Sequence, residues 1–313
     1  MIASTHLSLG LITILLVLSQ RVPVSNHQNK PVGDSNDASY VKAIEKWRAE
    51  RLEEVNGDDG WTTLVGLFWL DEGRNRIGSD PSNAIVLPPN SAPKFAGSLV
   101  LNKGVVTLDA RPEAGITSDG KGVGTLVLRS DADGKPTLLR LGSLKLFVIK
   151  RGEKLGLRVK DKNHQARANF TGLSYFPLDM SFRIDAKFEA YDPPRIIPIA
   201  NVLGMVDSMT SPGRLVFELN GKSYRLDPVL ERGSEQLFII FADKTTGKET
   251  YGAGRYLYAD PPGADGKVVL DFNKAHNPSC AFTKFATCPL PPRQNRLAVR
   301  VEAGEKKYSG PGH

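Results

Sequence analysis

The sequence lacks a second long hydrophobic run. After the apolar segment 7–18 (LSLGLITILLVL), no segment is long and apolar enough to cross a membrane as a helix. Cysteine is also scarce, and neither Cys280 nor Cys288 lies near the apolar segment, which excludes a lipoprotein anchor. Met1 to His6 contain no lysine or arginine, so the start of the chain lacks the usual charged region of a secretory signal.

The apolar segment nevertheless predicts export. It is short for a mature transmembrane helix, and Val17-Leu18-Ser19 is a tolerable cleavage context. We expect residues 1–25 to be a signal peptide, with an uncleaved N-terminal anchor as the alternative. Residues 26–39 are polar and rich in turn formers, which predicts a linker. The mature protein is then expected to be periplasmic or extracellular.

The two cysteines lie in one short segment, and in an exported chain this predicts a disulfide between Cys280 and Cys288. Free buried thiols are the first alternative, and a metal ligand or nucleophile is the second. A metal site would need further ligands, because Cys-x7-Cys is not a usual zinc spacing and His276 is the one histidine nearby. We therefore expect no metal and no cofactor.

Composition and charge narrow the class of protein. A content of 40% hydrophobic and 24% charged residues is globular, and 30 Gly and 21 Pro favour many turns between short strands. The formal charge of +7 arises partly from a basic C-terminal segment. It predicts a soluble basic surface or an anionic partner, whereas nucleic acid is not expected because no recognition helix or base-stacking motif accompanies the charge.

Residue patterning predicts one helix followed by strands. Val41, Ile44, Trp47, Leu52 and Val55 recur near helical spacing over residues 40–55. Later segments alternate or flank tight turns, with alternation clearest over residues 182–190 and the strongest hairpin signal at Asn220-Gly221. A further hairpin is predicted at Asn102-Lys103-Gly104, and the last strand is predicted at residues 297–301. The fold class expected is mostly β, with two antiparallel β domains of sandwich or barrel type and one N-terminal amphipathic helix. We place the helix and the first domain at residues 40–165, and a C-terminal β domain carrying the candidate site at 166–313.

The segment 75–88 (NRIGSDPSNAIVLP) resembles the opening of a forkhead-associated domain, a β-sandwich whose loops bind phosphothreonine. Gly78 permits a tight turn, and residues 85–87 enter the sheet. The family's binding residues do not carry over: Ser79 replaces its arginine after the glycine, and Ser91 is followed three residues later by Lys94 rather than histidine. The resemblance therefore implies a degenerate sandwich of this type without phosphothreonine recognition.

Two polar segments are candidates for the functional site. In 243–256 (DKTTGKETYGAGRY) an acid, hydroxyls and an arginine surround a strand–turn–strand, where they could bind an anion or a sugar, although the same residues suit a hairpin loop. In 271–282 (DFNKAHNPSCAF) a strand ends and an irregular loop follows. His276 is a weak candidate for a general base oriented by Asp271, but the chain has no serine in a nucleophile elbow, and the acids and amides could equally cap the loop.

Several short runs together are similar to the bacterial proteins grouped as domain-of-unknown-function family 1684. They are GWTTLVGLFWL (60–70), TYGAGR (250–255), DFN (271–273), NP (277–278), CAF (280–282), CPLP (288–291) and AGE (303–305). The similarity extends from about Tyr40 to Tyr308. It implies a shared fold and no activity, and the family pattern leads us to expect an aromatic residue at the position of His276.

The leading hypothesis is a non-catalytic module of the bacterial envelope that binds a polar or anionic small molecule or a glycan. Its ligand-binding residues are expected to be Asp243, Thr250, Tyr251, Arg255, Asp271, Asn273 and Asn277. A hydrolase that uses Asp271 with a water or a metal is one alternative. A structural protein-interaction module that uses the segment 61–70 and the forkhead-like edge is another.

Overall fold

One long helix opens the described part of the chain. The computed structural model describes residues 1–2 and 35–310, and α1 covers Ser35–Asn56, so the helix begins inside the expected linker. Ile44, Arg51 and Val55 are buried at helical spacing. The expected signal or anchor, and most of the linker, lie outside the described residues. Within those residues, no helix is long and apolar enough to span a membrane.

Contacts divide the chain into a first unit, residues 1–40, and a second unit, residues 41–313. Its first part is a β-sandwich of two sheets. The five-stranded sheet has the order β3-β2-β4-β5-β8, with bounds Ile85–Val86, Gly73–Gly78, Gly97–Asn102, Val105–Ala110 and Thr125–Leu128. The six-stranded sheet has the order β1-β11-β10-β9-β6-β7, with bounds Leu64–Trp69, Lys154–Asp161, Leu144–Arg151, Leu139–Leu141, Thr117–Ser118 and Lys121–Gly122.

Apolar side chains from both sheets form one core between them, including Leu99, Leu108, Leu146 and Leu157. Such a core explains why both sheets alternate buried with exposed positions. The predicted hairpin at Asn102-Lys103-Gly104 is confirmed: β4 pairs with β5, and Lys103 and Gly104 have φ of +48° and +82°.

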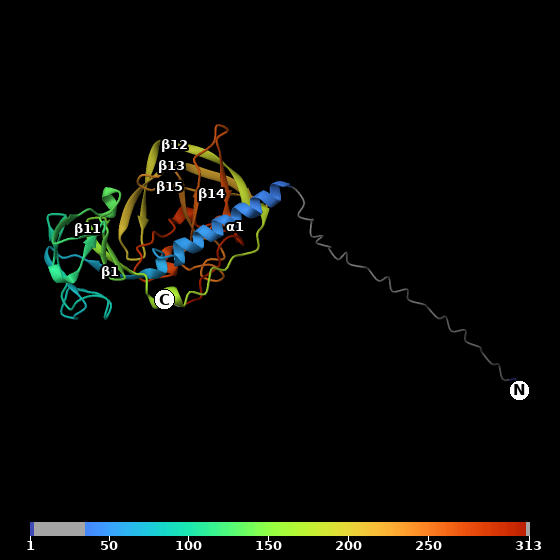
Figure 1. The fold of residues 1–313 in the computed structure, drawn as a ribbon. Coiled ribbons are helices and arrows are strands. Elements are labelled where there is room, and N and C mark those ends of the chain that lie inside the picture. The colour runs from blue at the N-terminus through green and yellow to red at the C-terminus, as the bar shows by residue number, and fades with distance from the viewer. Residues whose placement is uncertain (3–34, 311–313) are drawn as a thin grey trace. The chain divides into compact units, whose positions relative to one another are not determined.

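The second part of the chain forms a seven-stranded sheet, in which β12 and β13 are long neighbouring strands (Figure 1). The sheet order is β17-β16-β15-β13-β12-β18, and β14 pairs with β13. The bounds, in chain order from β12, are Arg183–Ala200, Val206–Leu219, Lys222–Leu226, Val229–Leu230, Leu237–Phe241, Arg255–Ala259 and Lys267–Asp271. The hairpin predicted at Asn220-Gly221 joins β13 to β14, with positive φ at both turn residues.

Short helices connect these strands. They are α2 (Gln165–Ala168) and the 3₁₀ turns η1 to η7, at Trp61–Thr63, Pro112–Ala114, Asp131–Asp133, Met180–Phe182, Phe272–Lys274, Ser279–Ala281 and Arg293–Asn295. The strand predicted at residues 297–301 is wrong, because this segment has no regular strand and its neighbour Arg296 makes only an isolated bridge with Ala242.

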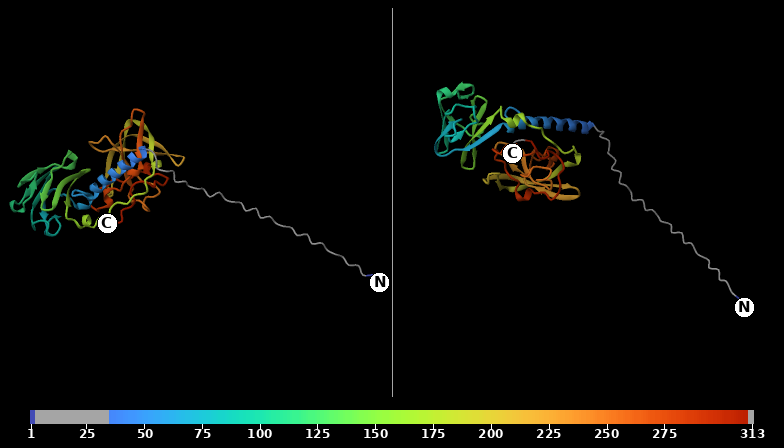
Figure 2. Two further views of the ribbon diagram at one scale, coloured as in Figure 1. Left: turned by 45° about the vertical axis from the view of Figure 1, so that its right-hand side comes forward. Right: turned by 90° about the horizontal axis from the view of Figure 1, so that it is seen from below.

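The expected fold class is confirmed: the chain is mostly β, its strands pair antiparallel except for β2 with β3, and one long helix precedes them. The sheet of β12 to β18 packs its own core, which includes Leu215, Phe241 and Phe272. A smaller cluster joins Val55 of α1 to Phe282 and Tyr308, and Figure 2 shows α1 and the sheet strands in two further views. The boundary placed near residue 165 stays a prediction.

Candidate functional site

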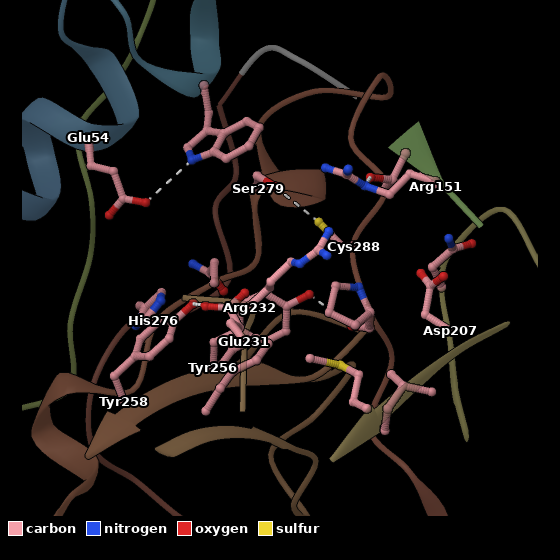
Figure 3. Close-up of a pocket in the computed structure, with 18 of the residues that line it drawn as sticks. Glu54, Arg151, Asp207, Glu231, Arg232, Tyr256, Tyr258, His276, Ser279 and Cys288 are labelled. Carbon is pink, nitrogen blue, oxygen red and sulfur yellow. Dashed lines mark hydrogen bonds between the residues drawn. The ribbon is translucent and has the colours of Figure 1, made fainter. Parts of the chain in front are cut away.

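A cavity of about 680 Å³ lies beside β11, β17, α1 and the loop around residue 288. This volume is in the usual range for a small-molecule pocket. Figure 3 shows charged, aromatic and sulfur-containing side chains around it. Its lining includes Arg51, Glu54, Trp61, Arg151, Arg158, Glu231, Tyr256, Tyr258, His276, Asn277, Ser279, Thr287 and Cys288.

Two of the arginines that line the cavity share one acceptor. Arg151 Nε and Arg158 Nη2 each donate to Thr287 Oγ1 at 3.2 Å. Arg151 is neutralised by Asp131, whose Oδ2 accepts from Arg151 Nη1 at 2.8 Å. Arg158 has no carboxylate within ion-pair distance among the described residues, and its side chain is the more deeply buried of the two.

Arg158 reaches the cavity because of strand periodicity. Leu155, Leu157 and Val159 of β11 enter the sandwich core, so Arg158 points to the opposite face of the sheet. There its guanidinium lies 5.6 Å from the ring centroid of Trp61. Its residue is only 6% exposed, and Nε has no hydrogen-bond partner among the described residues. Burial, followed by repulsion from Arg151, lowers the pKa of Arg158 to about 10, so it is charged at neutral pH.

Aromatic rings form one wall of the cavity. The Tyr258 ring is stacked on His276 at 5.9 Å between centroids, and Tyr256 meets the same imidazole edge-on at 6.1 Å. His276 Nδ1 donates to the Lys274 carbonyl at 3.1 Å. Burial, followed by the charge of Arg51, lowers the pKa of His276 to about 3. The imidazole is therefore neutral at physiological pH and serves as part of a flat wall.

Acidic side chains lie at the edge of this wall. Tyr258 Oη donates to Glu231 Oε2 at 3.0 Å, and Trp61 Nε1 donates to Glu54 Oε1 at 3.4 Å (Figure 3). Burial opposes the charge of Glu54, but the attraction and hydrogen bonding of Arg51 outweigh it, so the pKa of Glu54 is lowered. Glu54 and Glu231 thus border the aromatic wall, and Glu54 is paired with Arg51 Nη1 at 2.8 Å.

The two cysteines are free thiols in this structure, so the predicted disulfide is not formed in it and stays a prediction. Cys288 Sγ instead accepts a hydrogen bond from the backbone N–H of Cys280 at 3.1 Å and lies 3.1 Å from Ser279 Oγ. The 3₁₀ turn at 279–281 directs both of these groups toward the Cys288 sulfur. The sulfur is therefore held by hydrogen bonds and not by a covalent bond. Cys288 lines the cavity.

Three of the predicted ligand-binding residues lie inside the protein and bond to it. Arg255 is 1% exposed, donates to the carbonyl oxygens of Val301 (2.8 Å) and Ala303, and lies 3.6 Å from Asp243 Oδ1. Asp243 also accepts from the Val301 N–H at 2.6 Å, and its carboxylate accepts from Thr245 Oγ1, which bonds Thr250 Oγ1 at 2.9 Å. These side chains hold the C-terminal segment in place, and their role as ligand contacts stays a prediction.

Three more of these residues organise the loop that follows β18. Asp271 accepts from the Asn273 N–H at 3.2 Å and lies 3.9 Å from Lys274 Nζ. Asn273 Nδ2 donates to the Asp179 carbonyl at 2.8 Å. Tyr251 Oη donates to the Cys280 carbonyl at 2.9 Å. His276 Nδ1 bonds to the Lys274 carbonyl, and the role of His276 and Asp271 as a base and its orienting acid stays a prediction.

Asn277 is the one predicted ligand-binding residue that also lines the cavity. Its Nδ2 donates to the Lys306 carbonyl at 2.8 Å, and its backbone N–H donates to Glu305 Oε2 at 2.9 Å. Arg51 Nη2 donates to the Asn277 carbonyl at 2.7 Å. The wall at this residue is thus fixed by α1 and by the C-terminal segment together.

Sequence reasoning missed Arg151, Arg158 and Thr287. One signal was present: residues 155–159 read LGLRV, in which a charged residue interrupts an apolar strand. Such an arginine is expected at an exposed sheet face unless another part of the chain covers it. Here residues 287–289 and Trp61 cover that face of β11. The sequence does not reveal that these distant segments meet there.

Three comparisons place the chain among known proteins. The family model described as "Protein of unknown function (DUF1684)" matches residues 168–306. No curated protein matches significantly. The solution NMR structure of an uncharacterized protein from Haloarcula marismortui is 35% identical, over 45% of this chain and 78% of that one, with a TM-score of 0.38.

A second solved structure bears on the forkhead-associated resemblance. It comes from a study titled as an analysis of phosphothreonine-dependent FHA domain interactions, and it is 21% identical over 31% of this chain and 96% of that one. The TM-score of 0.21 is too low to support an argument about binding. The sandwich itself rests on the two sheets and their shared core.

Proposed function

The chain belongs to the family of proteins of unknown function DUF1684, whose description names no activity, and we propose from its own cavity that it binds a small anionic molecule carrying a flat apolar group. The observation that carries this proposal is Arg158, a buried guanidinium without a carboxylate partner among the described residues, whose Nε has no acceptor. A buried charge without a counter-charge is costly, and a bound anion would supply that counter-charge.

The lining of the cavity supports both parts of the ligand. Arg158 and Arg151 lie on one side, joined through Thr287 Oγ1, so they can donate charge-assisted hydrogen bonds to one carboxylate or phosphate group. Trp61, Tyr258 and His276 all line the cavity and supply an apolar, aromatic surface against which a ring could pack.

This proposal keeps the expected ligand class, a polar or anionic small molecule, and moves its site from the segment 243–277 to the cavity. The function is binding, without a catalytic step. A location outside the cytoplasm and the absence of a nucleic-acid partner stay predictions. The hydrolase alternative also stays a prediction, and it lacks support from the cavity because Asp271 is outside its lining.

The experiment compares Arg158→Met with wild type in two measurements. Calorimetric titration with phenyl phosphate should show binding to wild type and a loss of about tenfold or more in the variant, which lacks the charge-assisted hydrogen bonds. Thermal melting without ligand should show the variant to be as stable as wild type or more stable, because methionine fills similar volume without burying an unpaired charge. An arginine that only holds the fold together would give a lower melting temperature.

Two further titrations sharpen the result. Arg74→Gln removes the same charge from an exposed surface ion pair in the sandwich and should leave the affinity unchanged. Inorganic phosphate should bind wild type more weakly than phenyl phosphate, because it lacks the ring. Equal affinity of Arg158→Met and wild type for phenyl phosphate, or no binding to wild type, would overturn the proposal.

A further inference from the structure

Two thiols lie one behind the other at the cavity wall. Cys288 lines the cavity and is 3% exposed, so the cavity is the side from which a small molecule would meet this residue. Cys280 is buried beside it in the 3₁₀ turn Ser279–Ala281. In Figure 3, the Cys288 sulfur lies next to Ser279, with the Ser279 hydroxyl directed at it. This geometry combines one accessible sulfur with a second sulfur close enough to interact with it.

The surroundings of Cys288 favour its thiolate. The Cys280 thiol, the Ser279 hydroxyl and the Cys280 N–H all donate to its sulfur. The hydrogen bond from the Cys280 thiol is the largest effect on the pKa of Cys288. Together with the other donors it outweighs burial, which acts in the opposite direction, and lowers this pKa to about 6. The same hydrogen bond, followed by burial, raises the pKa of Cys280 above its ordinary range. The proton of the pair therefore resides on Cys280.

The other charged and titratable groups around the pair come from three places. Arg158 of β11 interacts favourably with a negative charge on Cys288. Tyr256 of β17 lies beside the same sulfur, and its hydroxyl donates to the Pro289 carbonyl at 2.8 Å. Tyr251 is bonded to the Cys280 carbonyl, and burial raises its pKa, so it remains neutral. None of these three residues places a negative charge beside Cys288, so all three are compatible with a thiolate there.

We propose that Cys288 is a nucleophilic thiolate that exchanges with small disulfides entering the cavity, and that Cys280 then converts the product into an internal disulfide. In the first step Cys288 Sγ attacks one sulfur of the entering disulfide, whose sulfur–sulfur bond breaks to release one thiolate. In the second step the Cys280 thiol gives up its proton and attacks Cys288 Sγ, which releases the second thiolate. The thiolate–thiol pair loses two electrons and one proton, and the small disulfide takes up the electrons, that proton and a second proton from water to become two thiols.

This reaction needs no anion-binding site, so it is independent of the function proposed above. The reaction also connects the free thiols of the structure with the disulfide predicted from the sequence. The reduced form holds the free thiols of the structure, and the oxidised form holds the disulfide expected from the sequence in an oxidising compartment.

The probe is 2,2'-dithiodipyridine, a small neutral disulfide whose released thione absorbs light, applied to the reduced chain. Wild type should release two thiones per chain and lose the mass of two hydrogen atoms. The rate should rise with pH around a midpoint near 6. Cys280→Ser should release one thione and keep the pyridylthio group on Cys288. Cys288→Ser should react at pH 5 at least about tenfold more slowly than wild type, because the buried Cys280 stays protonated.

Ser279→Ala provides a matched variant, since it removes one donor to Cys288 and leaves both sulfurs. Its midpoint should shift to higher pH while two thiones are still released. Circular dichroism checks that each variant is folded. A wild-type midpoint at the ordinary thiol value of about 8.5, equal rates in Cys288→Ser and wild type, or a stable mixed disulfide in wild type would each overturn the proposal.

Discussion

Arg51 Nε donates a hydrogen bond of 2.9 Å to Glu305 Oε1, across 254 positions of sequence, and both side chains are buried. The second Glu305 oxygen accepts from the Asn277 N–H, whose carbonyl in turn accepts from Arg51 Nη2. Three distant segments thus form a closed network at one wall of the cavity. Because α1 holds this wall, the helix is a structural component of the binding site.

Glu305→Gln tests the strength of this network, and Glu54→Gln is its matched control. Both acids bond to Arg51, but the Glu305 side chain has 0% exposure and that of Glu54 has 56%. Removing one partner of a buried pair leaves an uncompensated charge, so Glu305→Gln should lower the free energy of unfolding by about 3 kcal/mol. Glu54→Gln should lower it by less than about 1 kcal/mol. Urea denaturation measures both, and similar losses would contradict the assignment.

The two glycines of the segment 250–255 should differ in how much stability is lost when each is replaced by alanine. Gly254 has φ of +85°, and a Cβ there would lie 2.5 Å from the Phe241 carbonyl oxygen and from Pro291 Cγ. Gly254→Ala should therefore destabilise the protein by about 2 kcal/mol or more. Gly252 is exposed with no neighbour within 4 Å, so Gly252→Ala should change stability by less than about 0.5 kcal/mol. Thermal melting of the two variants side by side would show whether position 254 is the constrained one.

The lowered pKa of His276 should make the protein less stable in acid. Its pKa falls from 6.5 to about 3 on folding, because burial disfavours the imidazolium. Between these values the unfolded chain binds a proton that the folded chain does not, so stability is lost as pH falls through this window. In His276→Phe, which keeps a ring against Tyr258, the free energy of unfolding should depend less steeply on pH between 6.5 and 4. Denaturation at several pH values gives both slopes, and equal slopes would show that His276 does not titrate as described.

The sequence determined much of the fold. Alternation over residues 182–190 gave a strand with one half-buried face, and Asn220-Gly221 gave a hairpin because both turn residues adopt positive φ. Residues 297–301 differ from this pattern. Their apolar side chains enter the core, but they form no regular strand: their backbone makes scattered bonds to Ala242 and Lys244 just after β16 and to the Asp243 side chain. An alternating pattern of apolar residues predicts which side chains are buried, but it does not specify which groups the backbone hydrogen-bonds to.

The candidate site depended on the tertiary structure. The polar residues of 243–273 looked available in the sequence, yet Asp243, Arg255 and Asn273 are buried and bond to carbonyls or amides from remote segments. The sequence alone determined that Arg158 lies on the face of β11 opposite the sandwich core, because side chains alternate along a strand. Only the tertiary structure decided that Thr287, Cys288 and Trp61 cover this face. Contacts between such distant segments are set by the packing of whole sheets and the helix, which no local pattern of residues specifies.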